Sequence, residues 1–136
     1  PVGLLLAGAL TFDHHTHLRH DLAPALGRSV PDPDPVQMAV TLEWMLAVLG
    51  NQIRAGDVPA LCGPVGLELT GPGGGAWTLT PAGVRKGLQG VRTTVTATAP
   101  SFPDWGTRRS GWREHGLEID GNTAAAEALL DQINVV

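Results

Sequence analysis

The sequence has little cysteine, little positive charge and no long uninterrupted apolar segment. The single cysteine, Cys62, excludes an internal disulfide and agrees with a reducing cytoplasm. Lysine and arginine number 9 against 13 aspartates and glutamates, which gives a net charge of −4 at pH 7. No basic stripe is present that could neutralise a run of phosphates, which argues against nucleic acid as a partner.

The most apolar segment, Leu4 to Leu10, is too short to cross a membrane. Glycines interrupt it, and it runs into Asp13 and a group of histidines well before the roughly 18 apolar residues that a membrane span requires. It also lacks a basic start, so we expect neither a membrane span nor a secretory signal.

What is present fits one globular domain with many turns. The chain has 136 residues, of which 43% are hydrophobic. Its 18 glycines and 11 prolines stay below the roughly 25–30% of the chain that is typical of disordered low-complexity sequences.

The sequence predicts three helices, the first because residues 3–23 show no strand alternation. We expect a histidine-rich leading helix over 4–23 within a leading segment 1–28, ended by Pro24, and then a Pro-rich linker over 29–35 in which Asp32 or Asp34 caps the next helix. The second helix covers 36–54, where apolar residues recur at spacings of four, three, four and four. Asn122 is expected to cap the third.

Alternating apolar residues predict strands at 65–69, 77–79 and 91–97, with a short one around Leu117 and Ile119. Strands and helices do not alternate regularly along the chain. We therefore predict that 36–136 forms an α+β domain with an antiparallel sheet of about four strands.

Four of the five histidines lie in seven positions between Asp13 and Asp21. On a helix, Asp13, His17 and Asp21 would share one face, with His14 and His20 beside them. An oxygen and an imidazole could then meet one divalent ion, for which zinc is suited, with a third protein ligand from elsewhere. The alternative is a solvated polar face without a ligand.

The residues around these histidines also allow a second interpretation. Asp13, His15, His17, Leu18 and Arg19 also resemble the first-strand metal motif of amidohydrolases of the dihydroorotase kind. On a strand, His15 and His17 would point to the same side. That family's (β/α)₈ barrel typically needs about 250 residues, and this chain offers only His115 as a further histidine.

The segment Leu10 to His17, followed by Asp21 to Arg28, resembles the helix-and-turn signature of the mycothiol-dependent maleylpyruvate isomerase family. The resemblance continues through the Pro-rich linker and the helix of 36–54, and then through Gly71–Trp77, Trp105–Arg113 and Glu118 to Val136. Asp13 stands where members usually have glutamate, and the spacing from His17 to Asp21 is one residue longer than usual. The preceding bundle helices and their metal-binding histidine are not in this chain.

The resemblance implies a metal-assisted, thiol-cofactor-dependent isomerase or transferase, with mycothiol as cofactor and a small carboxylate as substrate. It implies a leading helix from a DinB-like bundle and an α+β domain similar to sterol carrier proteins. Asp13 and His17 would bind the metal, with His14 and His20 as substitutes. The family's arginine would match Arg109 or Arg113, with a solvated surface cluster as the alternative for both.

Two further expectations concern this chain's activity and partners. The competing hypothesis to an enzyme is a non-catalytic α+β module that binds a small ligand or a partner. The apolar residues of the leading helix have no bundle to enter, and leaving them in water is unfavourable. We therefore expect a homodimer, or pairing with a missing bundle chain, in which a second chain could complete a metal site.

Overall fold

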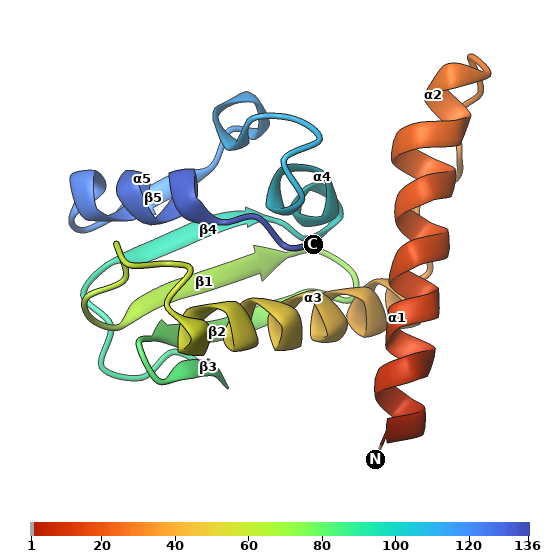
Figure 1. Ribbon diagram of the computed structural model, residues 1–136. Coiled ribbons are helices and arrows are strands. Elements are labelled where there is room, and N and C mark those ends of the chain that lie inside the picture. Colours follow the sequence, from red (N-terminus) through yellow and green to blue (C-terminus); the bar gives the residue numbers. More distant parts are fainter. Residues whose placement is uncertain (1) are drawn as a thin grey trace.

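The computed structural model describes residues 2–136, which form a helical arm and an α+β domain (Figure 1). The arm comprises residues 2–25 and contains α1 (Val2–Thr16), a π-helical segment η1 (His17–Leu22) and a last turn α2 (Ala23–Ala25). These three segments follow one another without a break, so the predicted leading helix is confirmed. It ends slightly later than expected, because Pro24 lies inside its last turn.

The second predicted helix is confirmed as α3 (Pro35–Ala55). The Asp34 carboxylate caps it by accepting a hydrogen bond of 2.7 Å from the Val36 amide, and Gly56 ends it with a left-handed φ of 88°. Its predicted apolar face is buried, with every member at most 6% exposed: Met38, Leu42, Met45, Leu49 and Ile53.

The sheet has five strands in the order β3-β2-β1-β4-β5. They are β1 (Val65–Thr70), β2 (Gly75–Thr80), β3 (Gly83–Lys86), β4 (Thr94–Thr98) and β5 (Glu118–Asp120). The α+β class is confirmed, with two differences in detail from the expected antiparallel sheet of about four strands. β3 is a fifth strand of only four residues, too short for alternation to be recognised, and β4 pairs parallel with β1.

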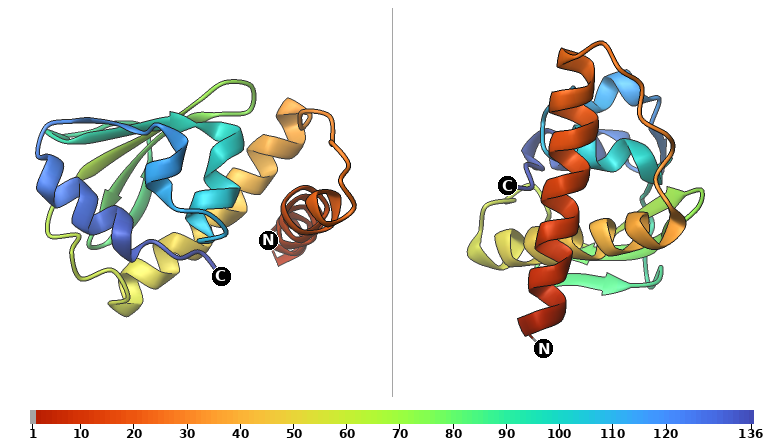
Figure 2. Two further views of the ribbon diagram at one scale, coloured as in Figure 1. Left: turned by 90° about the horizontal axis from the view of Figure 1, so that it is seen from above. Right: turned by 90° about the vertical axis from the view of Figure 1, so that its right-hand side faces the viewer.

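Helices cover one side of this sheet (Figure 2). They are α3, the short α4 (Phe102–Gly106) and α5 (Thr123–Gln132), whose N-cap is Asn122 as predicted. The 3-10 turns η2 (Ala99–Ser101) and η3 (Trp112–His115) flank α4 in the sequence. The core between these helices and the sheet includes Phe102, whose ring packs edge-on against Trp105 with the centroids 4.8 Å apart.

The arm crosses α3 at one end of the domain (Figures 1 and 2). Gly8 lies at this crossing, where a Cβ atom would be 3.4 Å from the Cβ of Trp44, an ordinary van der Waals distance. Among residues 2–136, no helix is long and apolar enough to span a membrane.

The helical state of the arm shows that the amidohydrolase interpretation is wrong. That motif requires His15 and His17 to leave a strand on the same side. On the helix they separate: His15 is 7% exposed and buried toward the domain, whereas the side chain of His17 is 61% exposed.

Candidate functional site

Asp13 and His17 face each other on the outer side of the arm. The Oδ1 atom of Asp13 lies 3.3 Å from Nε2 of His17, and both side chains are more than 60% exposed. The other ring nitrogen of His17, Nδ1, lies 2.7 Å from Oδ2 of Asp21. His17 is therefore held between two carboxylates, one on each ring nitrogen.

Asp21 lies four residues after His17, within the widened π-helical turn at residues 17–22. The amide of Ala23 donates to the carbonyl of Leu18, five residues back, which is the bond that defines such a turn. Ala23 alone separates this turn from Pro24, which has no amide hydrogen to continue the α-helical pattern.

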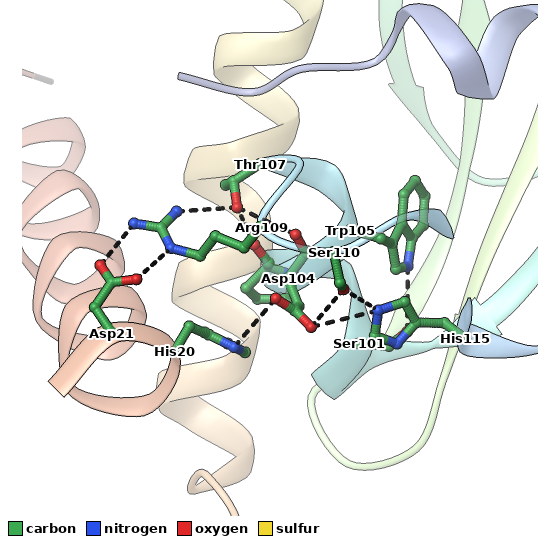
Figure 3. A network of polar contacts seen from close by, with 10 residues as sticks. His20, Asp21, Ser101, Asp104, Trp105, Thr107, Arg109, Ser110 and His115 are labelled. Carbon is green, nitrogen blue, oxygen red and sulfur yellow. Dashed lines mark hydrogen bonds and ion pairs between the residues drawn. The ribbon is translucent and has the colours of Figure 1, made fainter. Parts of the chain in front are cut away.

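Arg109 joins this group from the domain, 88 residues away in the sequence. Its Nε and a terminal nitrogen donate to the two carboxylate oxygens of Asp21 at 2.9 and 3.0 Å, and its remaining terminal nitrogen donates to Thr107 (Figure 3). The hydrogen bonds from Arg109 hold the pKa of Asp21 well below its usual range, and His17 acts in the same direction. Asp21 thus stays ionised and fixes the orientation of the His17 ring.

The other two histidines proposed as substitute ligands lie differently. His14 is exposed on the same side as His17, and both line one groove. His20 is turned toward the domain, where its Nδ1 lies 3.6 Å from Oδ1 of Asp104. Within residues 2–136, no three histidine, cysteine, aspartate or glutamate side chains converge in a way that could hold a metal ion.

The groove beside the Asp13–His17 pair has a volume of about 790 Å³. Its lining combines four polar residues with four aliphatic ones along one side of the arm. The lining residues are Leu10, Asp13, His14, His17, Leu18, Asp21, Leu22 and Ala25. This composition suits a ligand with an apolar part next to a group that binds a metal.

Asp104 is the centre of a second polar cluster, on α4 (Figure 3). Its Oδ2 accepts a hydrogen bond of 2.7 Å from Ser110 and lies 3.3 Å from Nε2 of His115, which also contacts Ser110. In a catalytic triad the serine and the acid would contact opposite ring nitrogens. Here both contact Nε2. The cluster therefore connects α4 to the segment that follows it, and it lacks the arrangement that activates a serine nucleophile.

Arg113, the second arginine expected to bind substrate, makes its contacts away from the histidines of the arm. It pairs with Asp131 at 2.8 Å and stacks on Trp112, with the guanidinium carbon 4.1 Å from the ring centroid. Arg108 instead donates to the carbonyls of Ile133 and Asp131 at 3.0 and 2.7 Å, which ties the C-terminal segment to α4. Of the three arginines, the structure therefore brings Arg109 alone to the Asp13–His17 pair.

Sequence reasoning missed Asp104 and the hydrogen bond between Asp21 and His17. The predicted helical face includes Asp21, and its position four residues after His17 was a usable signal for that bond. Asp104 had no such signal, because its partners come from an irregular segment and from the arm.

The sequence matches no protein-family model and no curated protein. Among solved structures, it is similar to the solution structure of the sterol carrier protein domain 2 of Helicoverpa armigera, with a TM-score of 0.53 and 17% identity over 75% of this chain and 91% of that chain. The apo form of Sterol Carrier Protein 2 from Yarrowia lipolytica gives a TM-score of 0.49 and 15% identity, with coverages of 76% and 96%. At such identities the likeness concerns the fold, and the first match confirms the expected sterol-carrier-like α+β domain.

Proposed function

We propose that the chain takes part in a metal-assisted, thiol-cofactor-dependent isomerase or transferase reaction like that of mycothiol-dependent maleylpyruvate isomerases. Asp13 and His17 would supply two ligands to zinc or another divalent ion. The observation that supports this most is the distance of 3.3 Å between Asp13 Oδ1 and His17 Nε2, with His17 Nδ1 hydrogen-bonded to Asp21.

The Asp13–His17 pair fits a metal ion in distance and in donor chemistry. Two neighbouring ligands of a tetrahedral zinc ion, each about 2.0–2.2 Å from it, lie roughly 3.3–3.5 Å apart. When Nδ1 of His17 carries a proton and donates to Asp21, its Nε2 has a lone pair facing the Asp13 carboxylate. Those two electron-rich atoms need a cation between them, either a proton on Nε2 or a metal ion.

The surroundings of His17 have the form of a supported metal ligand. Histidines that bind zinc commonly donate their second ring nitrogen to a carboxylate, which fixes the tautomer and raises the basicity of the ligand. Asp21 occupies that position, and Arg109 holds Asp21 with two hydrogen bonds. Arg109 is thus a positioning residue, acting on His17 through Asp21 rather than on the substrate.

A divalent ion with an open coordination position supplies a nucleophilic thiolate or hydroxide at neutral pH, since it lowers the pKa of the bound thiol or water. This chain's own residues bind and orient. The aliphatic side chains of Leu10, Leu18 and Leu22 would hold the apolar part of a ligand next to the Asp13–His17 pair. The third protein ligand would come from a group outside the described residues or from a second copy of the chain.

Calorimetric titration with Zn²⁺ tests this function. The parent should bind the ion weakly, because closed zinc sites in proteins generally use four ligands. His17→Ala should abolish the saturable heat, and Asp21→Asn should weaken binding by roughly 10–100-fold. His115→Ala removes a histidine that does not line this groove and serves as the control. Equal heats for the parent and His17→Ala would show that His17 is not a ligand of the ion.

The fold itself favours a second candidate function. A domain named as a sterol carrier shares this architecture, so the α+β domain could bind a small apolar molecule without catalysis. Displacement of a fluorescent apolar probe by fatty acids tests it. Saturable binding that His17→Ala leaves unchanged, in a protein that takes up no zinc, would favour this module over the enzyme.

A further inference from the structure

A second cavity lies on the other side of the arm, where the arm meets the domain. Its volume is about 290 Å³, which corresponds to the liquid volume of roughly ten water molecules. It shares no lining residue with the groove of the Asp13–His17 pair. Its walls come from three places: the arm, the segment that leads from the arm through the Pro-rich linker, and the 3-10 turn η2 at Pro100. The lining residues are His15, Arg19, His20, Ala23, Arg28, Ser29, Val30, Asp32, Pro33 and Pro100.

The charged residues of this cavity are unusual for a protein that is acidic overall. Arg19 and Arg28 both line it, and Asp32 is the only acid among its lining residues. Neither guanidinium makes a hydrogen bond or ion pair with another residue of the 2–136 range. Two arginines without such a partner therefore line the cavity.

A buried side chain without a partner points to the same cavity. His15 is 7% exposed, and its Nε2 is buried and makes no hydrogen bond in the described structure. Leaving such a polar atom buried and unpaired costs about 1–3 kcal/mol in general. Nε2 of His20 is also buried and unpaired, and the two rings lie 5.9 Å apart. A ligand that accepts hydrogen bonds would satisfy both rings.

We propose that this cavity binds a phosphate group through the guanidiniums of Arg19 and Arg28 and the Nε2 atom of His15. Phosphate matches the planar fork of arginine and has more acceptor oxygens than a carboxylate, so it can contact two guanidiniums and an imidazole from different sides. Histidine donates from Nε2 in one of its neutral tautomers, so His15 need not be charged to bind. The Ser29 hydroxyl supplies a further donor at the rim.

Binding there would join the arm to the domain, because the ligand would contact residues from both and from the linker between them. It would act independently of the Asp13–His17 pair on the outer side of the arm. The phosphate group could belong to a free ion or to a phosphomonoester, and titration with one compound of each kind distinguishes the two.

Titration of the chain with inorganic phosphate and with glycerol 3-phosphate at 0.15 M NaCl tests the proposal, since this salt concentration screens exposed charges beyond about 8 Å. We expect saturable binding of at least one of them and a rise in the unfolding temperature. Arg28→Gln, at an exposed position, should weaken binding at least tenfold, and Arg19→Gln should do the same. Arg85→Gln, an equal loss of charge at an exposed position on β3, should change it less than twofold.

Three results would overturn the assignment. The first is no saturable binding of either phosphate compound. The second is equal weakening in Arg28→Gln and Arg85→Gln, which would indicate a non-specific response to net charge. The third is acetate binding as tightly as phosphate, which would mean that the cavity recognises charge alone. His17→Ala should leave phosphate binding unchanged, so the failure of this proposal is distinguishable from failure of the metal site.

Discussion

Large apolar side chains are mostly buried in the α+β domain and mostly exposed in the arm. In the domain, large apolar side chains such as Leu42 and Leu49 are completely buried. In the arm, Leu4 is 73% exposed and Leu10 is 63% exposed, although α1 packs against α3. A helix in water is stabilised mainly by burying an apolar face. The domain achieves this alone, whereas the arm has buried only the side that contacts α3.

The proposed metal site lies in the region with the exposed leucines. The arm combines exposed leucines with the Asp13–His17 pair, and it connects to the domain through polar contacts such as the Asp21–Arg109 bonds. Such a surface suits a second protein surface or ligand that would cover the leucines and complete the coordination of a metal. Four experiments test this difference between the arm and the domain.

The same substitution should have very different effects in the two regions. Leu42→Ala removes a fully buried side chain and should lower the free energy of unfolding by about 2–5 kcal/mol. Leu10→Ala, at an exposed position of the arm, should change it by less than about 0.5 kcal/mol. Urea unfolding followed by circular dichroism measures both. Equal losses would mean that the arm is as well packed as the domain.

The exposed leucines should make the chain self-associate. Light scattering at micromolar concentration should give about twice the monomer mass of 14.2 kDa, and Leu6→Asp combined with Leu10→Asp should return it to the monomer. Val36→Asp introduces one such charge at a position of the domain that is 71% exposed and should leave the dimer intact. A monomeric parent would refute the expectation.

The contact between arm and domain should weaken in acid. Arg109 depresses the pKa of Asp21 in the folded state, so Asp21 contributes stability above the ordinary aspartate pKa of about 3.9 and loses it as pH falls below that value. Asp21→Asn should therefore lower the unfolding temperature at pH 6 and have a smaller effect at pH 3. Asp57→Asn, at another exposed position, is the control. The same decrease at both pH values would contradict the role of the ion pair.

The smallest effect is expected for Arg113, whose contacts do not involve the arm. Its ion pair with Asp131 is exposed, and surface pairs of this kind commonly contribute little. Arg113→Gln should leave the unfolding temperature unchanged within error and should not alter zinc binding. Arg109→Gln, which breaks the link from arm to domain, should weaken zinc binding. A loss of zinc binding in Arg113→Gln alone would reverse the assignment of the two arginines.

Local patterns predicted much of the fold and only part of the site. The face of α3 and the Asn122 cap follow from spacing within a few residues, and so does the pairing of His17 with Asp13. The Asp21–Arg109 bonds join residues 88 positions apart, and Arg109 lies in a segment without periodicity that would fix its direction. β3 was missed because four residues carry too little alternation.

The central claim is that Nε2 of His17 is a metal ligand held in place by Asp21. Nitrogen-15 NMR of the imidazole rings during titration with Zn²⁺ tests it most directly, because the two ring nitrogens give separate signals. We predict that the ion shifts the Nε2 signal of His17 while Nδ1 keeps its proton, and that His115 is unaffected. A zinc titration that leaves the His17 ring unchanged, or that shifts all five histidines alike, would contradict the account.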